Sequence, residues 1–326
     1  MDEFALIRQY FSHSTASIAK SASYVGVGDD CALLQPPQGE LVICKDVLIE
    51  GRHFFSDVDP FLLGHKALAV NLSDIAAMAA KPIACLLGLA LPRADAPWLE
   101  AFSRGFNRLA ERYDCALVGG DTTRSDAGVF ISVTALGLAQ QPLPLRANAE
   151  VGDDIWVSGD LGAPNIALGL LLKQQQASLS EQELALLAAT RPRLEQPEPQ
   201  VHLGQLLRPY VHAMIDISDG VLQDLSHLLT TSQLGAIVHA AQLPVHPALQ
   251  AVEAKHALEA VLAGGDEYQL CFSAAPDYRR QIEQCGLQAG TAVQRIGQIT
   301  AARELILLDA AGQVVENLPQ GFNHFP

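Results

Sequence analysis

Hydrophobic residues in the first 140 positions form strand-like runs that alternate with helical patterns. Apolar runs occupy residues 41–47, 83–91 and 129–139, and apolar residues recur at helical spacing over 62–80 and 98–112. The pattern predicts a mixed α and β domain.

A polar, proline-containing stretch, QQPLPLRANAEVGDD at 140–154, interrupts this alternation. Such a stretch is typical of a connection between structural units. We therefore expect an N-terminal domain over residues 1–140 and a C-terminal domain over 150–326.

The second half restarts with the strand-like IWVSGD and a helix that begins near Ala163. The polar segment KQQQASLSEQE at 173–183 is expected to be an exposed loop before the next helix. AMIDISDG is expected to lead from a strand into a helix, and YQLCF to be a buried strand. The final GFNHFP carries two aromatic residues where a frayed terminus is usually polar, so we expect it to dock on the protein.

Length and charge narrow the function classes. With 326 residues and 49% hydrophobic content, the chain can bury a sizeable core, most simply in two domains. Lys and Arg number 21 against 36 Asp and Glu, a formal net charge of -15 that argues against binding nucleic acid or anionic membranes. The longest apolar run, near 83–91, is about half of the roughly 20 residues that a membrane span needs.

The cysteines suggest a reducing compartment. Six are widely spaced and form no C-x-x-C pair, and the start MDEFALIRQYF does not resemble a signal peptide. Reduced thiols and a cytoplasmic location are expected.

Acidic residues recur where apolar strands end beside glycines or other small residues. They are Asp29 and Asp30 in GVGDDCALL, Asp46 in ICKDVLIEG, Asp121 in LVGGDTTRS, Asp216 and Asp219 in MIDISDG, and Asp266 and Glu267 in LAGGDEYQL. Any one of them could be an Asx turn or a helix N-cap. If several converge, their mutual repulsion would require cations, and hard oxygen donors select Mg²⁺ or Mn²⁺.

The helix expected at 62–80 is apolar on nearly every side, which indicates burial. Asn71 and Asp74 lie three residues apart on one of its faces. Because buried polar groups need partners, we favour a metal contact for Asp74 over a solvated carboxylate.

The usual nucleotide-binding signatures are missing. No Gly-Lys dipeptide occurs, so there is no P-loop, and no G-x-G-x-x-G follows a strand. Phosphoryl transfer depends mainly on positioning and charge neutralisation, which a multi-metal carboxylate site can supply without a P-loop.

Taken in order, GVGDDCALL, KDVLIEGRHF, ALAVNLSDIAAMAAKP, LVGGDTTRS, ISDG, GGDEYQLCF and GFNHF make the chain resemble the thiamine-monophosphate kinase family from end to end. The resemblance implies the two-domain aminoimidazole-ribonucleotide-synthetase-like α/β fold and a homodimer formed through N-terminal sheets. It also implies direct transfer of the ATP γ-phosphate to thiamine monophosphate, giving thiamine diphosphate, the last step in making that cofactor.

The same resemblance assigns roles to individual residues. The implied magnesium ligands are Asp30, Cys44, Lys45, Asp46, Asp74, Asp121, Asp216 and Asp219. The implied ATP contacts are Gly120, Asp121, Arg146 and Ser218, and the implied thiamine-phosphate contacts are His53, Asp266 and Phe322. No covalent nucleophile or general base is expected, because the substrate phosphate is already an anion.

Three positions depart from the family pattern. Lys45 replaces a usual Ser or Thr, and its ammonium could replace part of a metal's charge or point away. GGDEY stands for the common GGEDY, so either Asp266 or Glu267 could face the substrate. GFNHF stands for GYDHF, which keeps a ring at Phe322 without its hydroxyl.

Other readings stay open. Relatives with the same fold include aminoimidazole ribonucleotide synthetase, selenophosphate synthetase and the hydrogenase-maturation dehydratase. The last two expect an N-terminal or a C-terminal cysteine that is lacking here. A binding protein that kept the fold without catalysis would be expected to lose carboxylates, and this chain keeps nearly all of them.

Overall fold

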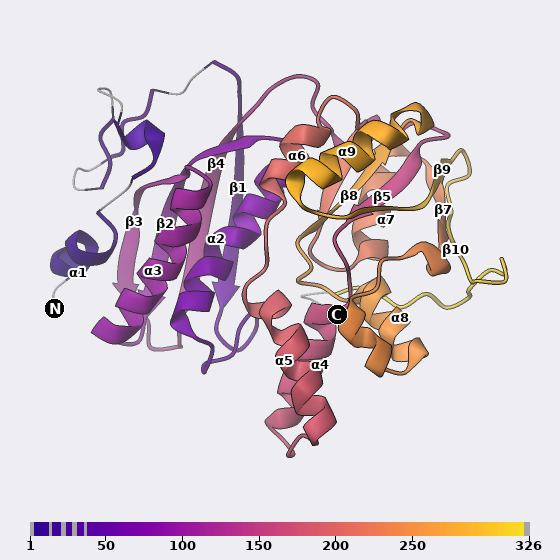
Figure 1. The fold of residues 1–326 in the computed structure, drawn as a ribbon. Coiled ribbons are helices and arrows are strands. Elements are labelled where there is room, and N and C mark those ends of the chain that lie inside the picture. The colour runs from indigo at the N-terminus through magenta and orange to yellow at the C-terminus, as the bar shows by residue number, and fades with distance from the viewer. Residues whose placement is uncertain (1–2, 13–14, 21–23, 28–30, 36–37, 323–326) are drawn as a thin grey trace. The chain divides into compact units, whose positions relative to one another are not determined.

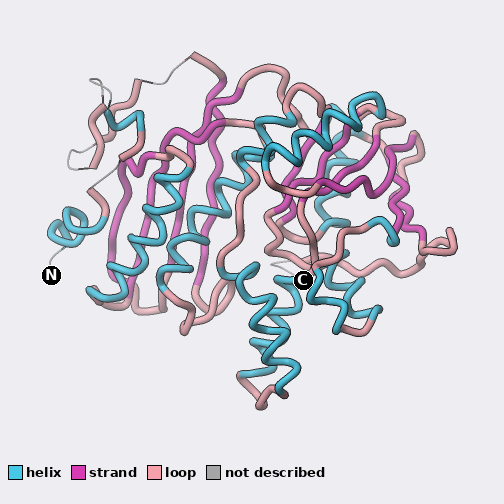
Figure 2. The backbone as a smooth tube through the Cα atoms, viewed as in Figure 1, coloured by secondary structure: helices cyan, strands magenta, loops and turns pink. Residues whose placement is uncertain are grey.

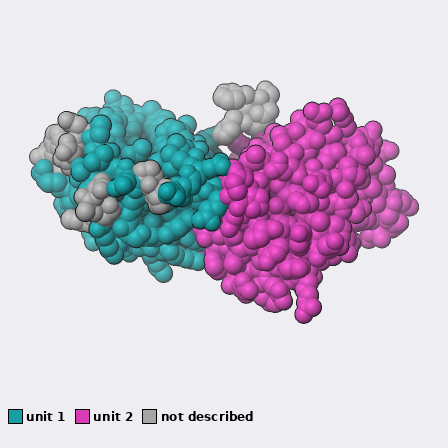
Figure 3. Space-filling view, turned by 90° about the horizontal axis from the view of Figure 1, so that it is seen from above, with its two compact units in different colours: residues 1–75, 80–140 teal, residues 76–79, 141–326 magenta. Residues whose placement is uncertain are grey.

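The computed structural model describes residues 3–12, 15–20, 24–27, 31–35 and 38–322, and it divides into two compact units. Unit 1 comprises residues 1–75 and 80–140, and unit 2 comprises 76–79 and 141–326 (Figure 3). Each unit has its own sheet and helices, which confirms the predicted two-domain α/β fold.

Unit 1 is built on a four-stranded sheet with the strand order β1-β4-β2-β3 (Figure 1). Its strands are β1 (Glu40–Ile49), β2 (Lys81–Leu91), β3 (Ala116–Arg124) and β4 (Phe130–Ala139). Strands β2 and β3 run parallel, and β4 pairs antiparallel with both β1 and β2. Helix α1 (Glu3–Tyr10) and the short 3₁₀ turn η1 (Ser17–Lys20) precede the sheet.

Helices α2 (Pro60–Ala77) and α3 (Ala96–Arg112) lie on one face of this sheet (Figure 1). Buried residues occupy nearly every side of α2, as its sequence predicts. Helix α3 is amphipathic and begins where Asp95 accepts a hydrogen bond from the backbone N–H of Trp98 at 3.2 Å. The opposite face of the sheet carries exposed hydrophobic side chains, among them Leu41, Ile43 and Val47.

Unit 2 contains a six-stranded sheet with the order β10-β7-β9-β5-β8-β6. Its strands are β5 (Asp154–Ser158), β6 (Ala213–Ile217), β7 (Gly235–His239), β8 (Gln269–Ala274), β9 (Val293–Thr300) and β10 (Leu305–Leu308). The β10–β7 pair is parallel and the others are antiparallel. Every residue of β5, β6 and β8 is buried, so these strands form the centre of the unit.

The helices of unit 2 are α4 (Ala163–Gln174), α5 (Glu181–Glu195), α6 (Val201–Leu207), α7 (Val221–Ser232), α8 (Ala254–Ala263) and α9 (Arg279–Ala289). Short 3₁₀ turns are η2 (Arg146–Asn148), η3 (Ala240–Gln242), η4 (Pro247–Ala251) and η5 (Pro276–Tyr278). Helices α4 and α5 form a hairpin that projects from the unit (Figures 1 and 2).

The loop expected at 173–183 is shorter than its polar composition suggested. Helix α4 continues to Gln174, and α5 begins at Glu181. Ser180 and Glu183 form a reciprocal capping box, which explains why the helix starts inside a polar run. In the described part of the chain, no helix is long and apolar enough to cross a membrane.

Candidate functional site

Unit 1 brings the side chains of Cys44 and Asp46 on β1 against Asn71 and Asp74 on α2. The Cys44 thiol donates to the Asn71 carbonyl oxygen at 3.3 Å, and the Asp46 backbone N–H donates to Asn71 Oδ1 at 3.2 Å. Asn71 is fully buried and also donates to the carbonyl of Ala67 at 3.3 Å. The Asn71 amide therefore links β1 to α2 and fixes the position of the strand on the helix.

Negative charge accumulates at this point of unit 1. Burial is the main cause that raises the pKa of the Cys44 thiol well above its usual value, and the charges of Asp74 and then Asp46 raise it further. Burial disfavours a charge of either sign, but the two carboxylates beside Cys44 favour a cation. The predicted neighbours Cys44, Asp46 and Asp74 are thus brought together.

Lys45 points to the other face of the sheet, because successive side chains of a strand alternate. Its ammonium donates to Ser132 Oγ at 2.6 Å and to Thr134 Oγ1 at 3.3 Å on β4. An ammonium has no lone pair to offer a metal. The geometry therefore supports the alternative in which the Lys45 side chain points away from the carboxylate of Asp46.

Like Lys45, Asp121 lies on the face of the unit 1 sheet that is opposite α2 and α3, which we call the open face. Gly88 on β2 pairs with Ser132 on β4 and with Asp121 on β3, so the three positions share one face. Asp121 is exposed and, within unit 1, is separated by the sheet from Asp46.

Gly120 precedes Asp121 in a conformation that favours glycine, with φ of 155°. A Cβ atom there would lie 1.9 Å from the carbonyl oxygen of Leu87. The glycine therefore lets β3 approach β2 closely at the point where Asp121 leaves the sheet.

His53 lies in the turn after β1. Its Nδ1 accepts a hydrogen bond from the backbone N–H of Ile49 at 3.0 Å. This bond places the proton of the neutral ring on Nε2, so the imidazole is oriented as a hydrogen-bond donor on that side.

In unit 2, the turn after β6 carries Ser218 and Asp219 at the N-terminus of α7. The backbone N–H groups of Ser218, Asp219 and Gly220 all donate to Oδ2 of Asp224, at 3.0, 3.0 and 3.1 Å. Asp224 is buried, and its pKa is raised to about 7, first by burial and then by the charges of Asp216 and Asp219. The turn is thus fixed by a residue that sequence reasoning missed.

The turn between α8 and β8, which contains Asp266, is joined to the Ser218 turn through backbone hydrogen bonds. The N–H of Asp266 donates to the carbonyl of Ser218 at 2.8 Å, and that of Tyr268 donates to Ile217 at 2.7 Å. Asp266 and Tyr268 have positive φ angles of 63° and 51°, which are uncommon outside glycine. Strain of this kind persists where surrounding contacts hold the backbone, often at functional sites.

The C-terminal segment packs on the same turn. The N–H of Phe322 donates to the Asp219 carbonyl at 3.1 Å, and Gln223 Nε2 donates to the Phe322 carbonyl at 2.8 Å. Asp219 and Phe322 line a groove of about 750 Å³ along α7. Unit 2 therefore brings Ser218, Asp219, Asp266 and Phe322 together.

Some predicted residues lie elsewhere. Arg146 is exposed in η2, and its carbonyl accepts from Ser232 Oγ at 2.5 Å, so it lies near the C-terminal end of α7 and Ser218 near the other. Asp30 lies outside the described residues, as do the last four positions of the chain. Among described residues, no three His, Cys, Asp or Glu side chains are grouped closely enough to hold a metal ion by themselves.

The sequence carries only weak signals for the contacts of Asp224 and Asn71. Asp224 has the pattern of an ordinary charge in the first turn of a helix, and Asn71, although noted beside Asp74, gives no sign of its bond to β1. Both act through hydrogen bonds to backbone N–H groups that are distant in sequence or revealed only by the turn geometry. Periodicity alone cannot find such contacts.

Comparison with known proteins places the chain among the AIR synthase related proteins. Residues 28–139 match the N-terminal domain of that family and residues 150–309 match its C-terminal domain. The thiamine-monophosphate kinase of Salmonella typhimurium is 39% identical over 325 residues, covering 99% of this chain and 98% of that protein.

Solved structures of thiamine-monophosphate kinases are also similar to this chain. The crystal structure of thiamine-monophosphate kinase from Stenotrophomonas maltophilia K279a is 41% identical with a TM-score of 0.80, covering 89% of this chain and 92% of that one. The structure of AaThiL complexed with AMPPCP and TMP is 30% identical with a TM-score of 0.76, covering 99% of this chain and 97% of that one. The chain therefore belongs to the thiamine-monophosphate kinase family, within the AIR synthase related proteins.

Proposed function

We propose that this protein is a kinase that uses ATP to phosphorylate thiamine monophosphate, giving thiamine diphosphate and ADP. The observation that carries the proposal is the junction of three segments in unit 2, where backbone bonds tie the Ser218–Asp219 turn to Asp266 and Phe322. The relative whose structure contains AMPPCP and TMP shares the fold over nearly the whole chain.

The reaction needs no covalent intermediate. An oxygen of the thiamine monophosphate phosphate attacks the γ-phosphorus of ATP in line, the new P–O bond forms, and the bond to the β-phosphate oxygen breaks to release ADP. The attacking oxygen is already anionic, so no general base is required. The main barrier is bringing two phosphate groups together, which positioning and charge stabilisation lower.

The donor set suits Mg²⁺. Hard carboxylate oxygens come from Asp46 and Asp74 in unit 1 and from Asp216 and Asp219 in unit 2. Burial is the main cause that raises the pKa of the neighbouring Cys44 and Asp224, and these carboxylate charges raise it further. With Asp30 and Asp121, and with Cys44 and Lys45 contributing at most main-chain atoms, these residues would hold several ions. Bound Mg²⁺ would neutralise the charge of the phosphates.

The remaining contacts follow the family pattern. Gly120, Asp121, Arg146 and Ser218 would contact ATP, and His53, Asp266 and Phe322 would contact thiamine monophosphate. The His53 ring presents its Nε2 as a donor suited to a phosphate oxygen. Phe322 in the groove beside Asp219 is suited to stack on the cationic thiazolium.

The N-terminal domain, residues 1–140, would provide the ATP and Mg²⁺ contacts of unit 1 and a dimer interface, with residues 150–326 as the C-terminal domain. The open face of the unit 1 sheet supports a homodimer, because Leu41, Ile43, Val47 and Leu86 are exposed there although they are large and apolar. All six cysteines are free thiols, which supports a cytoplasmic location.

The dimer can be tested by a charge on the open face. Ile43→Glu is expected to shift the protein from dimer to monomer in sedimentation velocity, because the exposed fraction of Ile43 is 62% in the single chain and a dimer would bury it. Leu287→Glu, at an apolar residue of unit 2 with an exposed fraction of 83%, serves as the control and should leave the mass unchanged. A monomeric wild-type protein would contradict the dimer.

The function is tested by incubating the purified protein with ATP, Mg²⁺ and thiamine monophosphate and following thiamine diphosphate by chromatography. Product is expected, and it should disappear without Mg²⁺. Tight binding of thiamine monophosphate without turnover would instead favour a binding protein. ATP consumption without thiamine diphosphate would favour another activity of the same fold.

Substitution of Phe322 tests the substrate groove. Phe322→Leu keeps an apolar side chain but removes the ring, so the KM for thiamine monophosphate should rise about 5- to 30-fold, the range expected for loss of a cation–π contact. The KM for ATP should stay unchanged. Equal rises in both KM values would show that Phe322 supports the fold rather than the thiazolium.

A further inference from the structure

Glu267 is a buried carboxyl group that the reaction as proposed does not use. It lies in the turn between α8 and β8, and only 4% of its surface is exposed. Its Oε1 accepts a short hydrogen bond from the backbone N–H of Gly162, which immediately precedes α4 and has a φ of 96°. Its Oε2 is buried and has no hydrogen-bond partner within the described residues.

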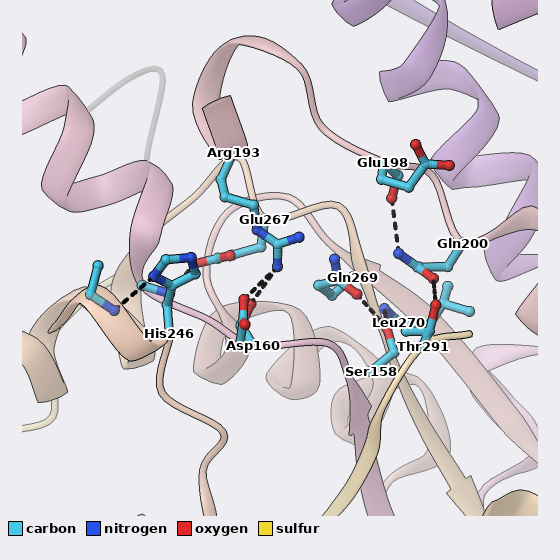
Figure 4. A network of polar contacts seen from close by, with 12 residues as sticks. Ser158, Asp160, Arg193, Glu198, Gln200, His246, Glu267, Gln269, Leu270 and Thr291 are labelled. Atoms are coloured by element: carbon cyan, nitrogen blue, oxygen red, sulfur yellow. Dashed lines mark hydrogen bonds and ion pairs between the residues drawn. The ribbon is translucent and has the colours of Figure 1, made fainter. Parts of the chain in front are cut away.

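The nearest cation to Glu267, Arg193, makes its hydrogen bonds to a different carboxylate. Arg193 on α5 donates through Nη2 to Asp160 Oδ1 at 2.6 Å and to the Asp160 carbonyl at 3.0 Å, so its charge is engaged (Figure 4). His246 accepts from Ala248 N–H through Nδ1, and burial lowers its pKa, which keeps the ring neutral near pH 7. A lone buried carboxylate is costly, so the neutral acid is favoured.

The titration behaviour agrees with this geometry. Burial raises the pKa of Glu267 to about 8 and outweighs the lowering effects of the Gly162 N–H and the Arg193 charge, while the charges of Asp160 and Asp266 add smaller raising effects. Near neutral pH the group therefore carries its proton.

The backbone on both sides of Glu267 is held in an unusual conformation. Asp266 and Tyr268 have positive φ, and the Tyr268 hydroxyl donates to Asp266 Oδ1 at 2.9 Å. Because Glu267 points into the core and is tied to Gly162, the partly exposed Asp266 is the carboxylate left to face a ligand. Compared with the common GGEDY, the order GGDEY thus places the shorter side chain, Asp266, at the surface and the longer one, Glu267, in the core.

We propose that Glu267 is a positioning residue, which in its protonated form anchors the Asp266–Tyr268 turn to the start of α4 and so orients Asp266 toward thiamine monophosphate. This proposal rests on the proposed function for its substrate. An ionised Glu267 would be driven toward water, and the turn would lose its anchor.

The protonation state can be tested without turnover. In the folded protein the pKa of Glu267 is raised above the unfolded value of about 4.3, so between that value and about 8 the folded state binds one more proton and loses stability as pH rises. Glu267→Gln mimics the neutral acid, so its Tm minus that of wild type should grow from pH 5 to pH 8 and then stay level. Glu283→Gln, at an exposed position of α9, should show no such trend. A constant difference for Glu267→Gln would overturn the protonated anchor.

Kinetics test the positioning role. Glu267→Gln should keep kcat/KM for thiamine monophosphate within about threefold at pH 7 and should remove the decline expected in wild type above pH 8. Glu267→Ala leaves the Gly162 N–H unpaired, so the KM for thiamine monophosphate should rise at least about tenfold, the effect of losing one buried hydrogen bond, with the KM for ATP unchanged.

A Gln variant as impaired as the Ala variant, or an Ala variant with normal KM, would overturn the positioning role. If wild type forms no thiamine diphosphate, the proposed function fails, whereas the Tm comparison still reports on Glu267. If Glu267→Ala does not fold, the kinetics of Glu267→Gln and their pH dependence test the positioning role instead.

Discussion

Asp46→Asn is expected to lower kcat for thiamine diphosphate formation by about 10²–10³-fold, the size of effect seen when one preorganised electrostatic contact to a transition state is removed. The substitution keeps the shape of the side chain and removes one negative charge. It also leaves the backbone N–H of residue 46 bonded to Asn71, so β1 should remain in place. The loss would therefore be electrostatic.

Measurement of Tm distinguishes a kcat lowered by the missing charge from a kcat lowered by unfolding. Asp46 stands beside Asp74 and the partly buried Cys44, where its charge is unfavourable without a cation. In metal-free buffer, Asp46→Asn should therefore have a Tm equal to or above that of wild type, because it relieves repulsion. Mg²⁺ should raise the Tm of wild type more than that of the variant.

Asp57→Asn is the matched control, since Asp57 is an exposed carboxylate in the same part of unit 1. Its kcat should stay near that of wild type. An Asp46→Asn variant with normal kcat would show that this carboxylate is not needed for catalysis, and an equal Tm gain with Mg²⁺ in both proteins would exclude it as a metal ligand.

Several features of the fold were predictable because they follow from residue periodicity. The apolar α2 is buried as expected, and its Asn71 and Asp74 share the face that meets β1. Alternation along β1 is enough to separate Asp46 from Lys45. The acidic turns of unit 2 were recognised from the glycines around them.

Other features depend on pairing between segments that are far apart in sequence. The position of Asp121 on the open face follows from the strand order and register, which a single sequence does not specify. The choice between Asp266 and Glu267 depends on a bond to Gly162, about a hundred residues earlier. Arg146 is placed by the packing of η2 near the end of α7, which a linker sequence does not reveal.

Gly220→Ala is expected to destabilise the protein by about 2–5 kcal/mol, from backbone strain together with a steric clash. Gly220 has φ of 127° and ψ of 141°, a region that is costly for any residue with a Cβ atom. That Cβ would lie 2.9 Å from the Cα and carbonyl carbon of Ala263, at the end of α8.

The clash would also reach the site. Ala263 leads directly into the turn that contains Asp266. The backbone N–H of Asp266 donates to the carbonyl oxygen of Ser218 at 2.8 Å. Any movement that accommodates the new methyl group must separate these two turns or displace Asp224 from the N–H of residue 220. The midpoint of urea unfolding should therefore fall, and kcat/KM for thiamine monophosphate should fall with it.

Gly169→Ala provides the control because Gly169 lies inside α4 and a Cβ atom there would have no neighbour within 4 Å. Alanine in the middle of a helix should stabilise the protein by about 0.5–1 kcal/mol relative to glycine, so the midpoint should rise and kcat/KM should not change. If Gly220→Ala kept both the midpoint and kcat/KM of wild type, the close contact of the two turns would not be needed to hold Ser218, Asp219 and Asp266 in place.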